Sequence, residues 1–170
     1  MDNGKRLWIA MVILGACARL LPHPWNFTPI IAIGLFSGYQ ARKFASGALV
    51  TLSALALSDA VLGFYSGVWY VYAAALVAVL FGRIARTRSS VGAIAAGALG
   101  SSLSFFILTN FMVWATGRMY PNTLAGLAAC FTAAIPFYQN QALGDAFYTV
   151  AIFGGYALLK GWLQPVHQAA

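Results

Sequence analysis

The sequence predicts an all-α integral membrane protein: a six-helix transmembrane bundle with a long outer loop, containing a half-helix, between spans five and six. The chain of 170 residues is 61% hydrophobic and only 8% charged, whereas a soluble domain carries about 25% charged residues. Its apolar residues also fall into segments close to the roughly 20 residues that a helix needs to cross a bilayer. Because these segments leave no room for a soluble module, we expect residues 1–170 to form a single transmembrane domain.

Six apolar segments are the candidate spans. They cover residues 7–22, 28–41, 44–63, 68–83, 91–115 and 142–163. The first begins after two basic residues, as a signal peptide does, but it ends in Arg19-Leu-Leu-Pro-His-Pro and has no small-residue cleavage site, so we interpret it as a retained span. The second and fourth are short, and they need flanking residues or local thinning of the bilayer to cross.

Small residues recur at four-residue spacing in two of these spans. They are Gly34 and Gly38 in the second span, and Gly92, Ala96, Gly100 and Ser104 in the fifth. Small side chains at this spacing let helices approach closely in lipid, so both sets predict helix packing. For the fifth span the alternative is a docking face for a partner protein.

A further apolar segment, residues 123–137, is interrupted by Pro136. Proline removes a backbone donor and disfavours a continuous helix. We therefore predict a re-entrant or surface half-helix within an outer loop of about 25 residues, and loops of that length are often lids or binding elements. A seventh span is the alternative.

The basic residues predict the orientation. With six spans, eight of the ten Lys and Arg residues fall on the side of both termini. These are Lys5, Arg6, Arg42, Lys43, Arg83, Arg86, Arg88 and Lys160. The positive-inside rule makes that side the cytoplasm, so we expect a multi-pass protein of the bacterial inner membrane with both termini cytoplasmic. A seventh span would place Lys160 outside. The net charge of +7 then belongs to short inter-span loops beside the lipid bilayer, and no nucleic-acid partner is expected.

The opposite, outer face combines balanced charges with aromatic and amide groups. Its charged residues are Arg19, Arg118, Asp59 and Asp145. An ionised carboxylate near hydrocarbon is costly unless it is paired or faces water. The uncharged polar and aromatic candidates are His23, Asn26, Tyr65, Asn110, Trp114, Tyr120, Asn122, Gln139 and Asn140. Polar groups that converge at one end of a helical bundle are typical of a binding site.

We expect these thirteen residues to bind a small polar or amphipathic solute. In this hypothesis the two acids receive donors or a cationic group, Arg19 and Arg118 receive an anionic group, and the aromatic rings pack on apolar parts. The alternative is structural: an internal salt bridge from Asp59 to Arg19 or Arg118, and an interhelical hydrogen bond for Asn110, since an amide in hydrocarbon needs a partner.

No catalytic constellation stands out, so we expect no enzyme activity. The sequence has no nucleophile with its base, no phosphate loop and no nucleotide motif. His23 and two separated carboxylates are too few and too scattered to predict a metal site. Cys17 and Cys130 form no disulfide framework or metal-binding pattern. No metal and no other cofactor is expected.

Five strings together resemble an uncharacterised bacterial inner-membrane family, which is similar to the substrate-binding S components of energy-coupling factor (ECF) transporters. The strings are Arg-Leu-Leu-Pro-His-Pro-Trp-Asn-Phe-Thr-Pro, Leu-Ser-Asp-x-x-Leu-Gly, Phe-Phe-Ile-Leu-Thr-Asn-Phe-x-x-Trp, Tyr-Pro-Asn-Thr-x-x-Gly-Leu and Ile-Pro-Phe-Tyr-Gln-Asn. The resemblance covers about residues 15–155. It implies a six-helix bundle that binds a small, vitamin-like molecule near its outer face, where the loops after spans one, three and five build and cover the site.

The resemblance also implies a partner, a transmembrane coupling protein with ATPases. The first span departs from the family's Ala-x-x-x-Ala docking pattern, because the residue four after Ala10 is Leu14. The alternative function is a structural or assembly subunit of a larger membrane protein complex. In that case the small residues of the fifth span dock on other membrane subunits, and the outer charges form internal salt bridges only.

Overall fold

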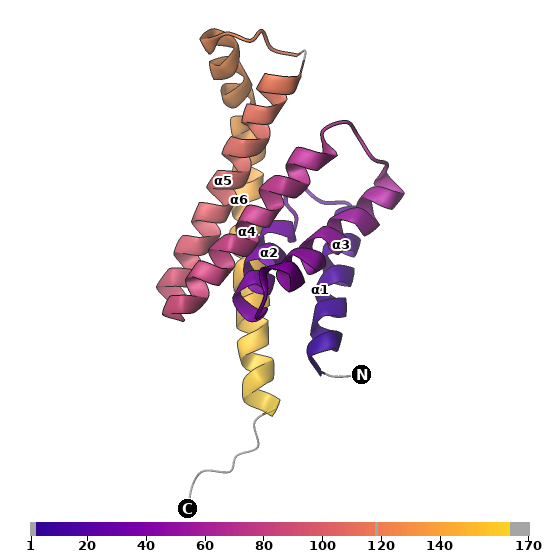
Figure 1. Cartoon of the computed structure of the whole chain (residues 1–170), viewed down its shortest axis with the longest axis vertical. Helices are drawn as coiled ribbons and strands as arrows, with labels where there is room; N and C mark the ends of the chain where they lie inside the picture. The colour runs from indigo at the N-terminus through magenta and orange to yellow at the C-terminus, as the bar shows by residue number, and fades with distance from the viewer. Residues whose placement is uncertain (1–2, 118, 164–170) are drawn as a thin grey trace, which may run out of the picture.

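A computed structural model describes residues 3–117 and 119–163, and in these residues the chain forms six α-helices and no strand (Figure 1). The helices are α1 (Asn3–Leu20), α2 (Ile30–Gln40), α3 (Phe44–Leu62), α4 (Val68–Arg88), α5 (Val91–Thr116) and α6 (Leu124–Leu163). Among the described residues, α3, α4, α5 and the part of α6 up to Lys160 are long and apolar enough to cross a membrane. The all-helical class predicted from the sequence is confirmed.

The two remaining helices differ from these four in length or charge. α1 has 18 residues but carries three basic side chains, Lys5, Arg6 and Arg19. α2 has only 11 residues, so at 1.5 Å per residue it is about 16 Å long, against a hydrocarbon core of about 30 Å. The short second span predicted from the sequence is therefore present as a helix of about half the length of a full crossing.

The short helix α2 lies at the centre of the bundle. It contacts each of the other five helices, and all its residues from Ile30 to Gly38 are buried. Its closest neighbour is α4: a Cβ atom added to Gly38 would collide with the carbonyl oxygen of Val79, and one added to Gly82 would collide with that of Leu35. The predicted packing role of the α2 glycines is confirmed, because any side chain at these positions would push the two backbones apart.

Helix α5 packs on α4 through only part of the predicted row of small residues, because a Cβ on Gly100 would collide with the ring of Phe81 (2.6 Å), and it also packs through a second row that was not predicted. Gly97 and Ser101 are buried, and a Cβ on Gly97 would lie 3.6 Å from that of Ala85 on α4. Gly92 and Ala96 are exposed instead, and a Cβ on Gly92 would meet nothing within 4 Å. The packing prediction is wrong for these two residues, since α5 carries two adjacent rows of small residues and their spacing alone does not say which one faces the bundle.

Successive helices alternate in direction, which gathers the basic loops at one end of the molecule (Figure 1). This basic end comprises the start of α1, the α2–α3 loop, the last turns of α4 and the end of α6. It holds the eight residues Lys5, Arg6, Arg42, Lys43, Arg83, Arg86, Arg88 and Lys160. The α1–α2, α3–α4 and α5–α6 connections lie toward the opposite end.

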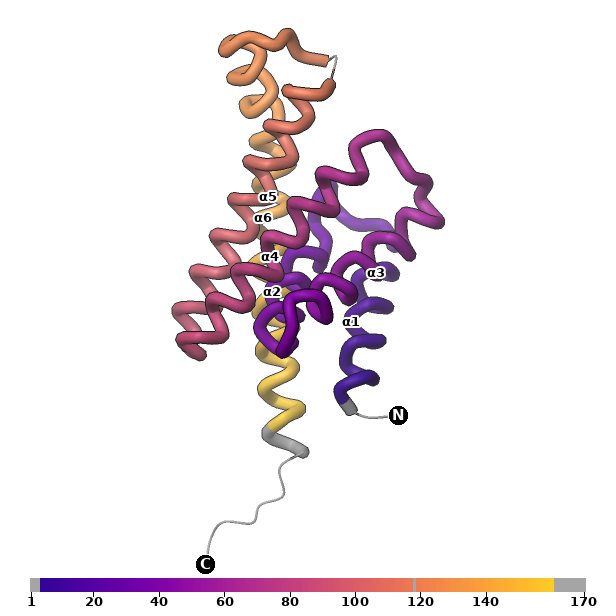
Figure 2. Tube along the Cα trace, viewed as in Figure 1, coloured from indigo at the N-terminus to yellow at the C-terminus, as the bar shows by residue number. Residues whose placement is uncertain are grey.

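The connection between α5 and α6 differs most from the sequence prediction. α6 begins at Leu124 and runs for 40 residues through Pro136, so residues 123–137 are not a separate half-helix and the linking segment covers only 117–123. The prediction of a long outer loop is wrong. Membrane helices tolerate proline because neighbouring groups satisfy the freed backbone carbonyl, and a helix still bonds most of its backbone. Figure 2 shows α5 and α6 as a long hairpin that extends beyond the α3–α4 loop.

Candidate functional site

A cavity of about 450 Å³ lies at the end of the bundle opposite the basic end. All six helices and the loops 21–29 and 63–67 contribute to its walls. Its polar lining residues are Arg19, His23, Asn26, Thr28, Tyr65, Tyr70, Thr109, Gln141 and Asp145. Its apolar lining residues are Ile30, Ile31, Leu55, Leu62, Val71, Phe105 and Val113. Both the volume and the mixture of apolar walls with a few polar groups are typical of small-molecule sites, which measure about 300–1,000 Å³.

The loop 21–29 places two of the predicted residues at this cavity. Asn26 adopts a left-handed conformation with φ of 61°, which Asn tolerates better than most residues, and the amide of Phe27 donates to the carbonyl of Pro24 (3.0 Å). The Nδ1 of His23 donates to the carbonyl of Leu21 (2.6 Å). These short-range bonds hold the loop in the non-helical shape that its three prolines predict.

Aromatic contacts anchor the same loop on α6. The rings of Trp25 and Phe137 meet edge to face with centroids 5.9 Å apart, and the rings of Phe27 and Tyr148 lie 5.6 Å apart. The loop therefore spans from the end of α1 to α6, and it carries His23 and Asn26 to the same cavity as Asp145.

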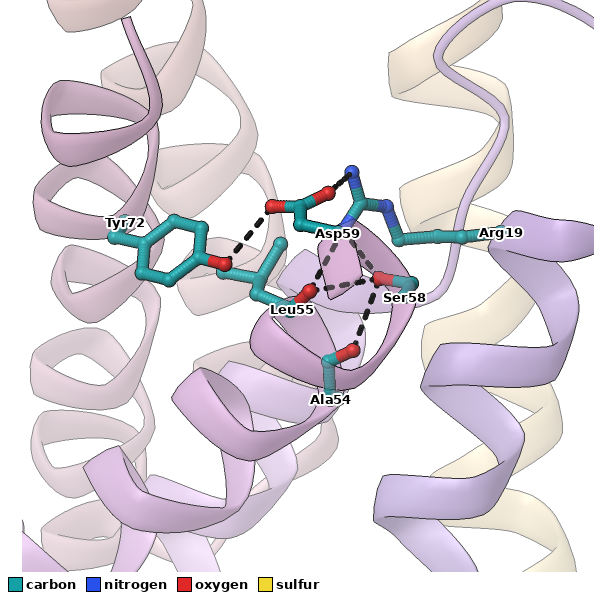
Figure 3. Close-up of polar contacts among 6 residues, drawn as sticks. All are labelled: Arg19, Ala54, Leu55, Ser58, Asp59 and Tyr72. Carbon is teal, nitrogen blue, oxygen red and sulfur yellow. Dashed lines mark hydrogen bonds and ion pairs between the residues drawn. The ribbon is translucent and has the colours of Figure 1, made fainter. Parts of the chain in front are cut away.

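Arg19 and Asp59 form a buried ion pair beside the cavity (Figure 3). Nη2 of Arg19 lies 2.7 Å from Oδ1 of Asp59, and the hydroxyl of Tyr72 donates to Oδ2 (2.9 Å). Nη1 of Arg19 donates to Oγ of Ser58 (2.5 Å) and to the carbonyl of Leu55 (3.3 Å). We call Arg19, Ser58, Asp59 and Tyr72 the Arg19–Asp59 cluster. It joins α1, α3 and α4 by charge-assisted hydrogen bonds, which are stronger than neutral ones.

The two charged residues of the Arg19–Asp59 cluster differ in their access to the cavity. Asp59 is 1% exposed, both of its carboxylate oxygens have partners, and it does not line the cavity. Arg19 does line the cavity, but its positive charge is already compensated. The internal salt bridge weighed as the structural alternative for Asp59 is thus present in the structure.

Asp145 has different surroundings from Asp59. It lines the cavity and is only 2% exposed. Its polar neighbours are the side chains of Ser102 and Gln141. Nε2 of Gln141 lies 3.5 Å from Oδ2 of Asp145 and donates mainly to the carbonyl (2.9 Å) and hydroxyl (3.2 Å) of Ser102. In residues 3–117 and 119–163, the only ion pair within 4.0 Å is that of Arg19 with Asp59. The carboxyl group of Asp145 therefore faces the cavity without a described counter-charge.

Tyr65, from the loop 63–67, also lines the cavity. Partial burial, and secondarily the negative charge of Asp59, raise the pKa of Tyr65 above its ordinary value of 10.0. The phenol is therefore neutral at physiological pH, and it can both donate and accept hydrogen bonds.

The structure brings five of the thirteen predicted residues to the cavity and places seven elsewhere. The five are Arg19, His23, Asn26, Tyr65 and Asp145. The seven are Asp59, Asn110, Trp114, Tyr120, Asn122, Gln139 and Asn140. The thirteenth, Arg118, lies outside the described residues.

Two of the seven make bonds near their own helix. Nδ2 of Asn110 donates to the carbonyl of Phe106 one turn earlier (2.8 Å), so this hydrogen bond lies within α5 and is not the interhelical bond of the structural alternative. Nε1 of Trp114 donates to the carbonyl of Pro121 (3.0 Å). That bond closes the connection between α5 and α6.

Four polar lining residues were not among the predicted site residues: Thr28, Tyr70, Thr109 and Gln141. A signal for Gln141 exists in the sequence. It lies four residues before Asp145, and residues four apart share one face of a helix. The spacing predicts that Gln141 and Asp145 share one face only if both residues belong to one helix. The predicted break near Pro136 placed Gln141 in a loop, so this prediction was not made.

In the described part of the chain, no three His, Cys, Asp or Glu residues gather where they could hold a metal ion. A family profile described as "Family of unknown function (DUF6580)" matches residues 2–167. The chain therefore belongs to this family, which agrees with its resemblance to an uncharacterised family. The comparisons with curated proteins and with solved structures found no match.

Proposed function

We propose that this DUF6580 protein is a membrane transport protein that binds a small, vitamin-like solute in the cavity, as the S components of ECF transporters do. One observation carries the proposal: a buried carboxyl group, that of Asp145, faces a cavity of about 450 Å³ with no counter-charge among the described residues. A buried carboxylate without a counter-charge is unfavourable in an apolar region. A ligand with a cationic or strongly hydrogen-bond-donating group would compensate it.

The other cavity groups fit a solute of mixed polarity. Arg19 lines the cavity with its charge compensated by Asp59, so we assign it hydrogen bonding to an acceptor and not capture of a free anion. His23, Asn26 and Tyr65 come from the two loops 21–29 and 63–67, and we assign them hydrogen bonds to polar groups of the solute. The apolar lining would pack on its carbon skeleton. The proposed role is binding, without catalysis.

We also propose six membrane crossings, with the basic end in the cytoplasm of a bacterium and the cavity at the outer face of the inner membrane. The positive-inside rule supports this orientation, and both termini are then cytoplasmic. α1 supports a crossing because its basic residues lie only near its two ends. The short length of α2 is compatible with six crossings, because a helix enclosed by five others does not have to match the thickness of the lipid.

Equilibrium binding by the purified protein in detergent tests the proposal. The probes are a panel of vitamins that includes cationic, neutral and anionic members. We expect a cationic or donor-rich member to bind, and Asp145→Asn to weaken that binding about 10- to 100-fold, since a hydrogen bond to a charged group contributes about 1.5–3 kcal/mol. The matched control is Gln139→Ala, an exposed side chain on the same helix that does not line the cavity.

Two results would count against solute binding. One is that no member of the panel binds the wild-type protein. The other is that Asp145→Asn binds the identified solute as tightly as the wild type does. Copurification of a coupling protein with ATPases from native membranes would further support a transport role.

A structural or assembly subunit of a larger membrane complex is the second candidate. The observation that favours it is the exposed row of small residues on α5, where Gly92 and Ala96 are not used for packing within the bundle. Other membrane subunits without ATPases should then copurify, and Gly92→Leu with Ala96→Leu should release them. If the same double variant leaves solute binding unchanged, the two candidates can be separated in one preparation.

A further inference from the structure

A second hollow, of about 410 Å³, lies at the basic end of the molecule. Its walls are Arg42, from the loop between α2 and α3, and Arg83, Arg86 and Thr87, from the last turns of α4. None of these residues lines the cavity that contains Asp145. We call this feature the arginine hollow.

The structure orients two of the three arginines. Nη1 of Arg83 donates to the carbonyl of Arg42 (3.1 Å), and Nη1 of Arg86 donates to the carbonyl of Ala41 (2.9 Å). Each bond uses one of the five N–H donors of a guanidinium, so most donors of both groups remain available. The two side chains are thereby held against the backbone just after α2.

The arginine hollow lacks an internal anion in the described part of the chain. The only ion pair there is that of Arg19 with Asp59, in the cavity half of the bundle. Three like charges around one hollow repel one another, so an external anion would stabilise this arrangement. The planar fork of a guanidinium matches the oxygens of a phosphate group in a bidentate way.

Exposed apolar side chains continue from the arginine hollow along α4. Leu80 is one turn before Arg83 and is 48% exposed, and Ile84 is one turn before Thr87 and is 61% exposed. Residues three and seven apart share one face of a helix, so Leu80, Arg83 and Thr87 lie along one strip. A site for a phosphate group beside an exposed apolar strip matches a phospholipid, which has a phosphate headgroup next to apolar acyl chains.

We propose that the arginine hollow binds a phosphate-bearing anion, and that in the membrane this anion is the headgroup of an anionic phospholipid. Basic pockets between transmembrane helices on the cytoplasmic side bind such headgroups in other membrane proteins. Arg42, Arg83 and Arg86 contact the phosphate, and the acyl chains lie along Leu80 and Ile84. The site is independent of the proposed solute cavity.

The test compares binding of phosphatidylglycerol with binding of phosphatidylcholine to the purified protein, by native mass spectrometry and by thermal shift. Inorganic phosphate in phosphatidylcholine micelles forms a separate arm. We expect a preference for phosphatidylglycerol that Arg42→Gln lowers about fivefold, the factor that corresponds to about 1 kcal/mol for the loss of one hydrogen bond to the phosphate. Arg42→Gln keeps the backbone carbonyl that Arg83 uses, so it removes a charge without removing that bond.

Further variants keep the test interpretable. Arg83→Gln should lower the preference by a similar factor, and Arg86→Lys should lower it less because it keeps the charge and loses only the fork. The matched control is Arg88→Gln, on the same helix but outside the arginine hollow, which should change the preference less than twofold.

Two outcomes overturn the proposal: equal binding of the two lipids with no stabilisation by phosphate, or an effect of Arg88→Gln as large as that of Arg42→Gln. Stabilisation by inorganic phosphate that Arg42→Gln abolishes, without a preference between the lipids, would support the phosphate site and overturn its assignment to a lipid.

Discussion

Replacing Arg19 with Gln should destabilise the protein more than replacing Asp59 with Asn. Asp59 is 1% exposed and has no access to water, so Arg19→Gln leaves a buried carboxylate whose only described ion pair, at 2.7 Å, has been removed. Removal of one partner of a buried pair lowers the free energy of unfolding by about 3–5 kcal/mol. The remaining hydrogen bond from Tyr72 does not compensate a full charge.

Asp59→Asn leaves the positive charge of Arg19 without its counter-charge, but this charge is less buried than that of Asp59. The side chain of Arg19 is 16% exposed and lines the cavity, so its guanidinium keeps contact with water. It also keeps its bonds to Ser58 and to the carbonyl of Leu55. We therefore expect a loss of about 1–2 kcal/mol, near the value for one hydrogen bond to a charged group.

The double variant Arg19→Gln/Asp59→Asn removes both charges and should lose about 2–4 kcal/mol, less than the sum of the two single losses, about 4–7 kcal/mol. The difference, a coupling energy of about 2–3 kcal/mol, is within the range seen for residues in one network. Unfolding in mixed micelles with increasing dodecyl sulfate, followed by tryptophan fluorescence, measures all three variants, with Arg88→Gln as the exposed control. Equal losses in the two single variants, or strictly additive losses, would refute the asymmetric buried pair.

Two further predictions use the same unfolding assay. Gly38→Ala should lower the free energy of unfolding by about 1–3 kcal/mol, because its methyl group collides with the backbone of α4. Gly92→Ala should be neutral or stabilising by up to about 1 kcal/mol, since that site is open. Equal effects of the two variants would contradict the close approach of α2 and α4. Tyr72→Phe should cost about 1.5–3 kcal/mol because it removes a hydrogen bond to the buried carboxylate, and a loss below about 0.5 kcal/mol would indicate that this bond is not formed.

The apolar segments of the sequence located the helices well but not all of their ends. α3 and α5 begin at the predicted residues and end within one residue of the prediction. α4 runs to Arg88 instead of stopping near Arg83, because hydropathy marks where a chain leaves the lipid and not where its helix ends. Basic residues in the last turn of a helix interact favourably with its dipole, so α4 continues past the apolar region.

Which predicted residues lie at the cavity depended on how well the sequence predicted the backbone around them. The proline-rich loop after α1 predicted a fixed shape, and it carries His23 and Asn26 to the cavity. The predicted loop around residues 123–141 directed attention to Gln139 and Asn140, although the continuous helix α6 turns Gln141 toward the cavity instead. Gln139, Asn140 and Gln141 point in different directions around one helix. Which of them faces the cavity can be predicted only if residues 124–163 are treated as one continuous helix, and the predicted loop did not do so.

The two buried acids show how similar tetrapeptides acquire different roles. Leu-Ser-Asp-Ala and Leu-Gly-Asp-Ala differ only at the residue before the acid. Before Asp59, Ser58 accepts a bond from Arg19 and so helps to hold the cation that neutralises the acid. Before Asp145, Gly144 has no side chain, and a Cβ there would lie only 3.0 Å from Cα of Phe27. The absence of a Cβ at residue 144 lets the loop 21–29 close over α6, and this brings Asp145 beneath the loop that carries His23 and Asn26. The serine helps build an internal ion pair, whereas the glycine helps to form the cavity that makes the second acid a candidate for ligand binding.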